Sequence, residues 1–143
     1  MIVGTLILNP TKQNIISLGK GKFDFMLLDF QHSSFTWEIA DFVIETVYTY
    51  TDKKIWIRVS NNNFADINRA YDIGADAVVV PLIDTINDLK NCINAARYKP
   101  IGNRSWGPVR LRENYHSYED YFKNAHSAQL LFPQIESLQG LNN

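Results

Sequence analysis

Two polar side chains follow an apolar run near the start of the chain and could perform acid–base chemistry. The run Phe25–Asp29 is typical of a buried strand, and its last residue, Asp29, is followed three positions later by His32. A carboxylate at this distance can accept a hydrogen bond from one ring nitrogen, which orients the imidazole and raises its basicity. The spacing therefore predicts that His32 is a general base supported by Asp29. A histidine that only ends a strand and bonds to backbone groups is the open alternative.

Three further polar side chains stand at the ends of later apolar runs. Arg58 follows one such run, and its planar guanidinium is suited to hold a carboxylate or an enolate oxygen. A structural ion pair of Arg58 with Asp29 or Glu136 fits the spacing equally well. Gln134 and Glu136 end the last run, where the Glu136 carboxylate could bind a hard cation. One carboxylate is a weak metal signal, so a solvated Glu136 also stays open.

The elements that must position these residues alternate between short apolar runs and amphipathic helical patterns. The predicted strands are Ile2–Leu8, Phe25–Asp29, Ile55–Val59, Ala77–Val80 and Leu130–Ile135. The predicted helices are Thr11–Leu18, one capped by Thr36, Ala65–Ile73 capped by Asn63, one from Asp84 or Thr85 through Arg97, and one near Tyr118–Ala125. A long irregular stretch is expected at Tyr98–Glu113. This regular alternation of strand and helix favours a parallel sheet.

Two architectures fit a parallel sheet, and the positions of the polar side chains favour one of them. A doubly wound sheet usually carries a Gly-rich phosphate turn after its first strand, and the sequence has none there. A TIM barrel instead places its catalytic groups at the carboxyl ends of several successive strands. The candidate side chains fall at such positions. The predicted fold is therefore α/β, a partial TIM barrel with about the first five of its eight β/α units.

Composition limits the function classes. The 143 residues are 45% hydrophobic and 20% charged, which suits one globular domain with a core. The net charge of −1 and the absence of a basic stretch exclude electrostatic steering to nucleic acid or to an anionic membrane. Neither a membrane span nor a signal peptide is evident, so we expect a cytoplasmic protein with a small-molecule partner. The single cysteine, Cys92, lies in a helical pattern and is expected to be buried.

Five segments of the sequence resemble, in order and spacing, the HpcH/HpaI aldolase/citrate lyase family. They are residues 23–32, 56–59, 72–81, 97–108 and 133–137. Within the family the resemblance is to the metal-dependent pyruvate aldolases. It implies a carbon–carbon lyase that cleaves a 4-hydroxy-2-oxo acid to pyruvate and an aldehyde.

The resemblance also implies a role for each candidate side chain. His32, supported by Asp29, is similar to the acid/base group of the family. Arg58 is similar to the arginine that holds the pyruvyl oxygen and stabilises the enolate. Glu136 resembles the first protein ligand of a divalent cation, Mg²⁺ or Mn²⁺, and Gln134 resembles a polar group that binds substrate beside it. The cation would polarise the 2-oxo group of the substrate.

The resemblance leaves the site incomplete. Segment 102–108 is similar to a loop that closes over the barrel mouth, in which Arg104 either supports the loop or contacts substrate. The family carries a second metal-binding aspartate on the strand after Glu136, which we expect residues 1–143, as a single amino-terminal portion of the barrel, to lack. An open sheet edge favours a homo-oligomer or a complementing chain. An inactive fragment, one half of a split aldolase and a non-catalytic module that binds oxo acids or other proteins are the alternatives.

Overall fold

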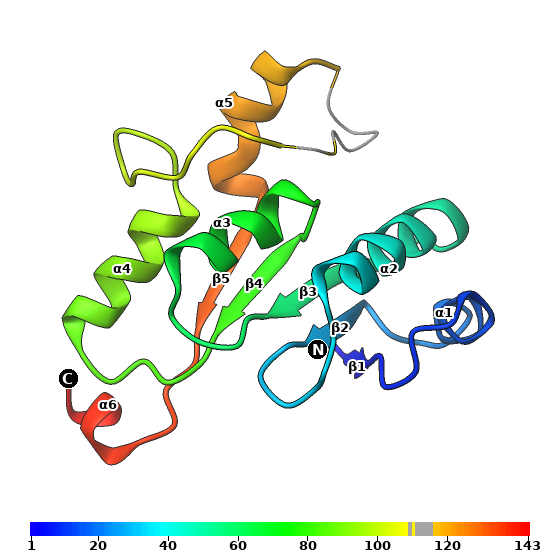
Figure 1. Ribbon diagram of the computed structural model, residues 1–143, viewed down its shortest axis with the longest axis horizontal. Coiled ribbons are helices and arrows are strands. Elements are labelled where there is room, and N and C mark those ends of the chain that lie inside the picture. The colour runs from blue at the N-terminus through cyan, green and yellow to red at the C-terminus, as the bar shows by residue number, and fades with distance from the viewer. Residues whose placement is uncertain (109, 111–115) are drawn as a thin grey trace.

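Each predicted strand pairs in parallel with its neighbour in the sequence to form one sheet (Figure 1). The computed structural model describes residues 1–108, 110 and 116–143. The strands in these residues are β1 (Gly4–Leu6), β2 (Phe25–Asp29), β3 (Lys54–Arg58), β4 (Ala77–Val80) and β5 (Leu130–Pro133). The helices are α1 (Lys12–Gly19), α2 (Trp37–Tyr50), α3 (Phe64–Asp72), α4 (Ile86–Ala96), α5 (Tyr118–Ala128) and α6 (Leu138–Asn142). The predicted parallel α/β architecture is confirmed.

The predicted elements differ from the observed ones mainly at their ends. Strand β1 is shorter than the predicted Ile2–Leu8 because it pairs with β2 only over Gly4–Leu6. The side chains of Ile2 and Leu8 lie in solvent, with exposed fractions of 73% and 81%. Helix α6 was not predicted, and Ser137 caps its five residues. The described part of the predicted irregular stretch contains neither helix nor strand, and residues 109 and 111–113 of that stretch lie outside the described residues.

Side chains that cap helix starts explain where the helices begin. The Thr36 hydroxyl accepts a hydrogen bond from the third residue of α2, and the Asn63 side chain accepts two from the first turn of α3. At α4 it is Thr85, not Asp84, that forms the cap, in a reciprocal box with Asp88. Among the helices of the described residues, none has the length and apolar character needed to cross a membrane.

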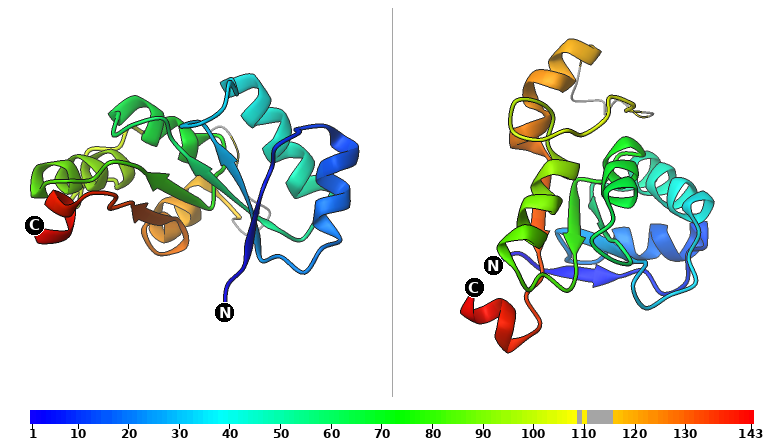
Figure 2. Two further views of the ribbon diagram at one scale, coloured as in Figure 1. Left: turned by 90° about the horizontal axis from the view of Figure 1, so that it is seen from below. Right: turned by 60° about the vertical axis from the view of Figure 1, so that its left-hand side comes forward.

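One face of the sheet is buried beneath the helices. The side chains that point from this face towards the helices are fully buried: Met26, Leu28, Ile55, Ile57, Val78 and Val80. They form a single apolar cluster with buried residues of α1, α2, α3 and α4. Figure 2 shows these helices following the curve of the sheet. Burial in one cluster means that the helices cover the outer side of the curved sheet, as in a barrel wall.

The opposite face carries an aromatic row made of Phe25, Trp56 and Phe132. The Phe25 and Trp56 rings stack with their centroids 3.5 Å apart, and Trp56 stacks on Phe132 at 4.7 Å. The Phe25 ring lies directly over Gly4, where any Cβ atom would overlap it. Phe132 keeps 38% of its surface exposed. The inner face is therefore apolar and partly open to solvent.

Cys92 on α4 is expected to resist thiol reagents in the folded protein. Its side chain is fully buried, and its sulfur contacts Asn62 Oδ1 at 3.2 Å. Burial, with the Asp88 carboxylate nearby, raises the pKa of this thiol to about 11, so almost no thiolate forms at pH 8. We expect a chromogenic disulfide reagent to react at pH 8 only after urea unfolds the chain. Rapid reaction without urea would contradict the burial of this thiol.

Candidate active site

The predicted site residues come together at the carboxyl edge of the sheet, the edge at which its parallel strands end. Asp29 and Arg58 are the last residues of β2 and β3, and they are direct register partners. Gln134 and Glu136 follow the end of β5 at the same edge. The hydrogen bond and charge of Asp29 raise the pKa of Arg58 against the effect of burial, and electrostatic attraction from Glu136 adds to this. Strands β2, β3 and β5 therefore carry their polar side chains at one edge of the sheet.

Asp29 and Arg58 form a two-point ion pair. The Nε atom of Arg58 donates to Asp29 Oδ1 at 2.9 Å, and its Nη2 donates to Oδ2 at 2.6 Å. The two side chains are 16% and 18% exposed. Burial opposes ionisation of Asp29, but the hydrogen bonds from Arg58 and from the Gln31 backbone N–H outweigh it, so the pKa of Asp29 lies below its ordinary value. Within the described residues Arg58 Nη1 has no partner and can reach a ligand.

The structure gives Asp29 partners other than the predicted one. Its carboxylate accepts from Arg58 and from the Gln31 N–H at 3.0 Å, and no hydrogen bond to the His32 ring occurs in the described part of the chain. The fixed guanidinium fork binds a carboxylate more strongly than a neutral imidazole does. The His32 ring therefore does not hydrogen-bond to Asp29 in this conformation, and the support of His32 by Asp29 stays a prediction. The ion pair that the sequence left open is the arrangement observed.

His32 instead lines a hollow beside Asp29, here called the β1–β2 hollow. Its cavity volume is about 410 Å³. The residues that line it come from the end of β1 and from the loop between β2 and α2: Leu6, Ile7, Leu8, Asp29, His32, Ser33, Ser34 and Phe35. An exposed imidazole at the wall of a hollow is accessible to a small ligand.

Leu82 contacts the Glu136 carboxylate, which the residue patterns did not predict. Its backbone is left-handed, with φ of 58°, and its N–H donates to Glu136 Oε2 at 3.2 Å. This conformation costs a non-glycine residue roughly 1–2 kcal/mol, and such strain tends to occur at functional sites. Nothing in the residue type signals it. The contact orients the exposed Glu136 carboxylate at the carboxyl edge.

The metal ligands at this edge are too few for a cation site of this chain alone. Glu136 offers a carboxylate and Gln134 an amide oxygen. In the residues that the structure describes, no group of three His, Cys, Asp or Glu side chains is arranged to hold a metal ion. Mg²⁺ and related hard cations take about six oxygen ligands, several of which can be water. The described residues therefore supply part of a site at most.

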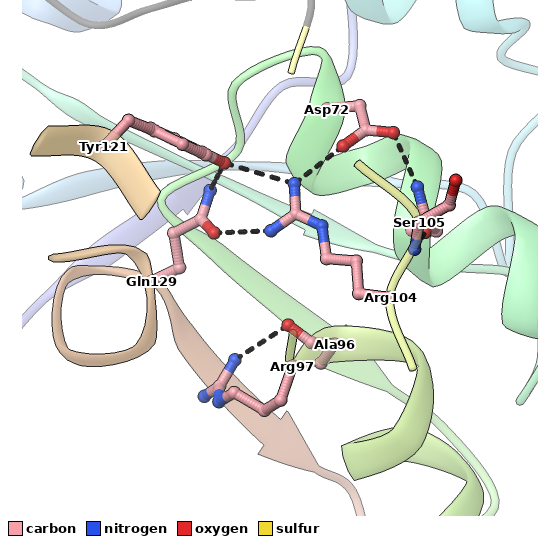
Figure 3. A network of polar contacts seen from close by, with 8 residues as sticks. Asp72, Ala96, Arg97, Arg104, Ser105, Tyr121 and Gln129 are labelled. Atoms are coloured by element: carbon pink, nitrogen blue, oxygen red, sulfur yellow. Dashed lines mark hydrogen bonds and ion pairs between the residues drawn. The ribbon is translucent and has the colours of Figure 1, made fainter. Parts of the chain in front are cut away.

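Segment 102–108 does not close over this edge. Arg104 donates to Gln129 Oε1 and Asp72 Oδ1, both at 2.7 Å, and to the Tyr121 hydroxyl at 3.1 Å (Figure 3). Gln129 immediately precedes β5, so this network lies at the amino edge of the sheet. The predicted loop over the barrel mouth is wrong, because the segment leads from α4 back towards the start of a strand. With its side chain 0% exposed, Arg104 supports the loop and does not contact substrate.

Comparison with known proteins identifies the family. The residue pattern of the HpcH/HpaI aldolase/citrate lyase family matches residues 9–143. The chain belongs to this family. It is 30% identical over 122 residues to a 2-keto-3-deoxy-L-rhamnonate aldolase of Klebsiella pneumoniae, covering 85% of this chain and 45% of the relative. It is 24% identical over 141 residues to a 2-dehydro-3,6-dideoxy-6-sulfogluconate aldolase of Pseudomonas putida, covering 99% of this chain and 55% of the relative.

A solved member of the HpcH/HpaI family shares the fold. The crystal structure of an HpcH/HpaI aldolase from Desulfitobacterium hafniense matches with a TM-score of 0.85 at 17% identity. The match covers 99% of this chain and 55% of that one. The chain thus spans about half the length of the relatives it matches, and its five parallel strands correspond to part of their TIM barrel. The predicted partial barrel is confirmed.

Proposed function

We propose that the carboxyl edge is part of the active site of a carbon–carbon lyase of the pyruvate aldolase type. It would cleave a 4-hydroxy-2-oxo acid to pyruvate and an aldehyde. The observation that carries this proposal is the Asp29–Arg58 ion pair with Arg58 Nη1 left free, beside Glu136. Family membership supports it, because relatives are named as aldolases.

Arg58 binds the pyruvyl half of the substrate in this proposal. Its free Nη1 donates to an oxygen of the 2-oxo acid, and its charge offsets the negative charge of the enolate that forms on cleavage. Asp29 holds the other two nitrogens at 2.9 and 2.6 Å and thereby fixes the plane of the guanidinium. Because the pKa of Asp29 lies below its ordinary value, this carboxylate stays charged at neutral pH. Asp29 is thus a positioning residue.

His32 is the acid/base group. Its ring lines the β1–β2 hollow and is accessible to the 4-hydroxyl of a substrate. The imidazole takes the hydroxyl proton while the C3–C4 bond breaks, and the bond's electron pair becomes the pyruvate enolate. Return of a proton to C3 completes pyruvate, and the C4 fragment leaves as the aldehyde.

Glu136 is proposed as one ligand of a divalent cation, with Gln134 beside it in contact with substrate. When bound, Mg²⁺ or Mn²⁺ supplies Lewis-acid polarisation of the 2-oxo group. The remaining ligands come from water and from polypeptide beyond the described residues. Residues 1–143 are then the amino-terminal portion of a barrel, completed in a homo-oligomer or by a complementing chain that also covers the open aromatic row.

Pyruvate release tests this assignment. We expect the purified chain to release pyruvate from a 4-hydroxy-2-oxo acid with Mn²⁺, and EDTA to stop the reaction. Glu136→Gln is expected to lower the rate more than about tenfold, since even outer partners of a metal site contribute 10–100-fold. Glu119→Gln, the same change at an exposed residue of α5 away from this edge, is the control. A folded homo-oligomer of this chain that releases no pyruvate would remove the enzymatic assignment and favour a binding module, measurable as pyruvate affinity by calorimetry.

A further inference from the structure

The walls of the β1–β2 hollow differ in chemistry between its two sides. The end of β1 contributes the aliphatic side chains of Leu6 and Leu8, which are 46% and 81% exposed. The loop after β2 contributes His32, Ser34 and Phe35. The hollow therefore offers apolar contact along one wall and hydrogen bonding along the other.

Among the residues that the structure describes, no lysine or arginine lines this hollow. The sequence has none in residues 6–11 or 29–37, which supply the lining. The nearest lysine along the chain, Lys12, donates to the Tyr50 hydroxyl at 2.6 Å and is thus engaged elsewhere. The one carboxylate of the lining, Asp29, is already paired with Arg58. A second anionic group on a ligand would find no cation here.

Ser34 supplies the hydroxyl that is free to bind a ligand. Its neighbour Ser33 donates to the backbone carbonyl of Asp29 and accepts from the Phe35 N–H, so that hydroxyl is occupied. Ser34 makes no hydrogen bond within the part of the chain that the structure describes, and its side chain is exposed. A neutral polar group, such as a substrate hydroxyl, is the partner that suits it.

The β1–β2 hollow lies on the side of the proposed site where the atoms beyond carbon 4 of the substrate would extend. The strand order puts β1 at one end of the sheet and β5 at the other, with Asp29 and Arg58 between them. The pyruvyl half extends from Arg58 towards Glu136 in the proposed function. The atoms beyond carbon 4, next to His32, then extend in the opposite direction into the β1–β2 hollow.

We propose that the β1–β2 hollow is the subsite for the aldehyde half and that it selects a short, uncharged aliphatic or hydroxylated aldehyde. This inference rests on the proposed function. Leu6 and Leu8 contact the carbon chain, Ser34 binds a hydroxyl, and an aldehyde with its own anionic group is disfavoured. The names of the relatives span both kinds, because a rhamnonate carries one acid group whereas a sulfogluconate carries two.

Two matched substrates test the subsite. We expect kcat/KM for 4-hydroxy-2-oxohexanoate to exceed that for 4-hydroxy-2-oxoheptane-1,7-dioate by about tenfold, since one exposed charge interaction at close range has about this effect. Leu8→Lys places a cation in the hollow and is expected to remove or invert the preference. Ile2→Lys, at a residue 73% exposed before β1 and at the opposite edge, is expected to leave it unchanged.

Calorimetric affinities for the same two compounds test the subsite without any need for turnover. Tighter binding of the hexanoate, reversed by Leu8→Lys and not by Ile2→Lys, supports the subsite even where no pyruvate appears. In that case only the proposed lyase activity fails. Equal or better binding and turnover of the dioate by the unaltered chain would overturn the subsite and leave the lyase assignment intact.

Discussion

Replacing Arg104 by methionine is expected to lower the free energy of unfolding by about 3–5 kcal/mol, the usual cost of removing one partner of a buried ion pair. The guanidinium is fully buried and joins Asp72, Tyr121 and Gln129, which come from α3, α5 and the start of β5 (Figure 3). Methionine fills a similar volume but removes the donor to Asp72 Oδ1 and to Gln129 Oε1. Urea unfolding followed by circular dichroism measures the loss.

Arg110→Met is the matched control for this variant. Arg110 also forms ion pairs, with Asp41 and Glu45, but its side chain is 26% exposed and those of its partners 47% and 64%. Ion pairs in such exposed positions contribute about 0–1 kcal/mol. Equal losses for the Arg104 and Arg110 variants would mean that the buried network does not stabilise the fold as proposed.

The Arg104→Met deficit is also expected to depend on pH. Burial raises the pKa of Asp72 above its ordinary value, while Arg104 and Asn68 act in the opposite direction. Without the guanidinium this pKa rises further. A carboxyl whose pKa is higher in the folded than in the unfolded state binds more protons when folded, so stability is gained as the pH falls towards the folded pKa. The deficit should therefore be smaller at pH 5 than at pH 7.

A double variant separates this electrostatic effect from lost packing. Asp72→Asn removes the carboxylate that Arg104→Met leaves without a counter-charge, so the double variant is expected to be more stable at pH 7 than the single one. It should also lose the extra dependence on pH. A deficit that is the same at both pH values, and the same in the double variant, would show that the carboxylate is not its cause.

The strands and helices were predictable because apolar patterns and helix caps depend on residues that are close together in the sequence. Ala77–Val80 is a run rich in β-branched residues that packs against α3, and its predicted bounds match those observed. The caps at Thr36 and Asn63 were predicted because a side-chain oxygen before a helix meets N–H groups only a few residues away. Helix α6 was missed because its five residues carry no periodic apolar pattern and depend on Ser137.

The site was only partly predictable because its geometry depends on contacts between strands. Parallel order places Asp29 and Arg58 at one edge, and this followed from the sequence. They are neighbours across the sheet because of the register of β2 and β3, which the sequence does not show. This register brings the Arg58 guanidinium, and not the His32 ring, to the Asp29 carboxylate. Arg104 lies at the amino edge because its segment leads from a helix to the start of the next strand. The resemblance of segment 102–108 to a family loop gave no information about that edge.

Arg58→Ala is expected to lower pyruvate release by about 10²–10³-fold, the range seen when a donor to a developing oxyanion is removed. Arg58→Lys should restore little of it, because an ammonium cannot keep two bonds to Asp29 and present a third donor to substrate. Arg69→Ala, at an exposed arginine of α3, is the control and should retain full activity. Activity that survives Arg58→Ala would remove the central element of the proposed site.

The titration of Asp29 gives a second measure of the same pair that needs no turnover. Hydrogen bonds and charge from Arg58 help to hold the pKa of Asp29 below its ordinary value, against the effect of burial. In Arg58→Ala only burial and backbone N–H groups remain, so the carboxyl carbon should titrate at a higher pH by NMR.

A carboxyl with a lowered folded pKa stabilises the fold at neutral pH and loses that contribution as the pH falls through the folded pKa. The variant should therefore lose less stability between pH 5 and pH 2 than the unaltered chain, and an unchanged acid profile would mean that the ion pair does not persist in solution.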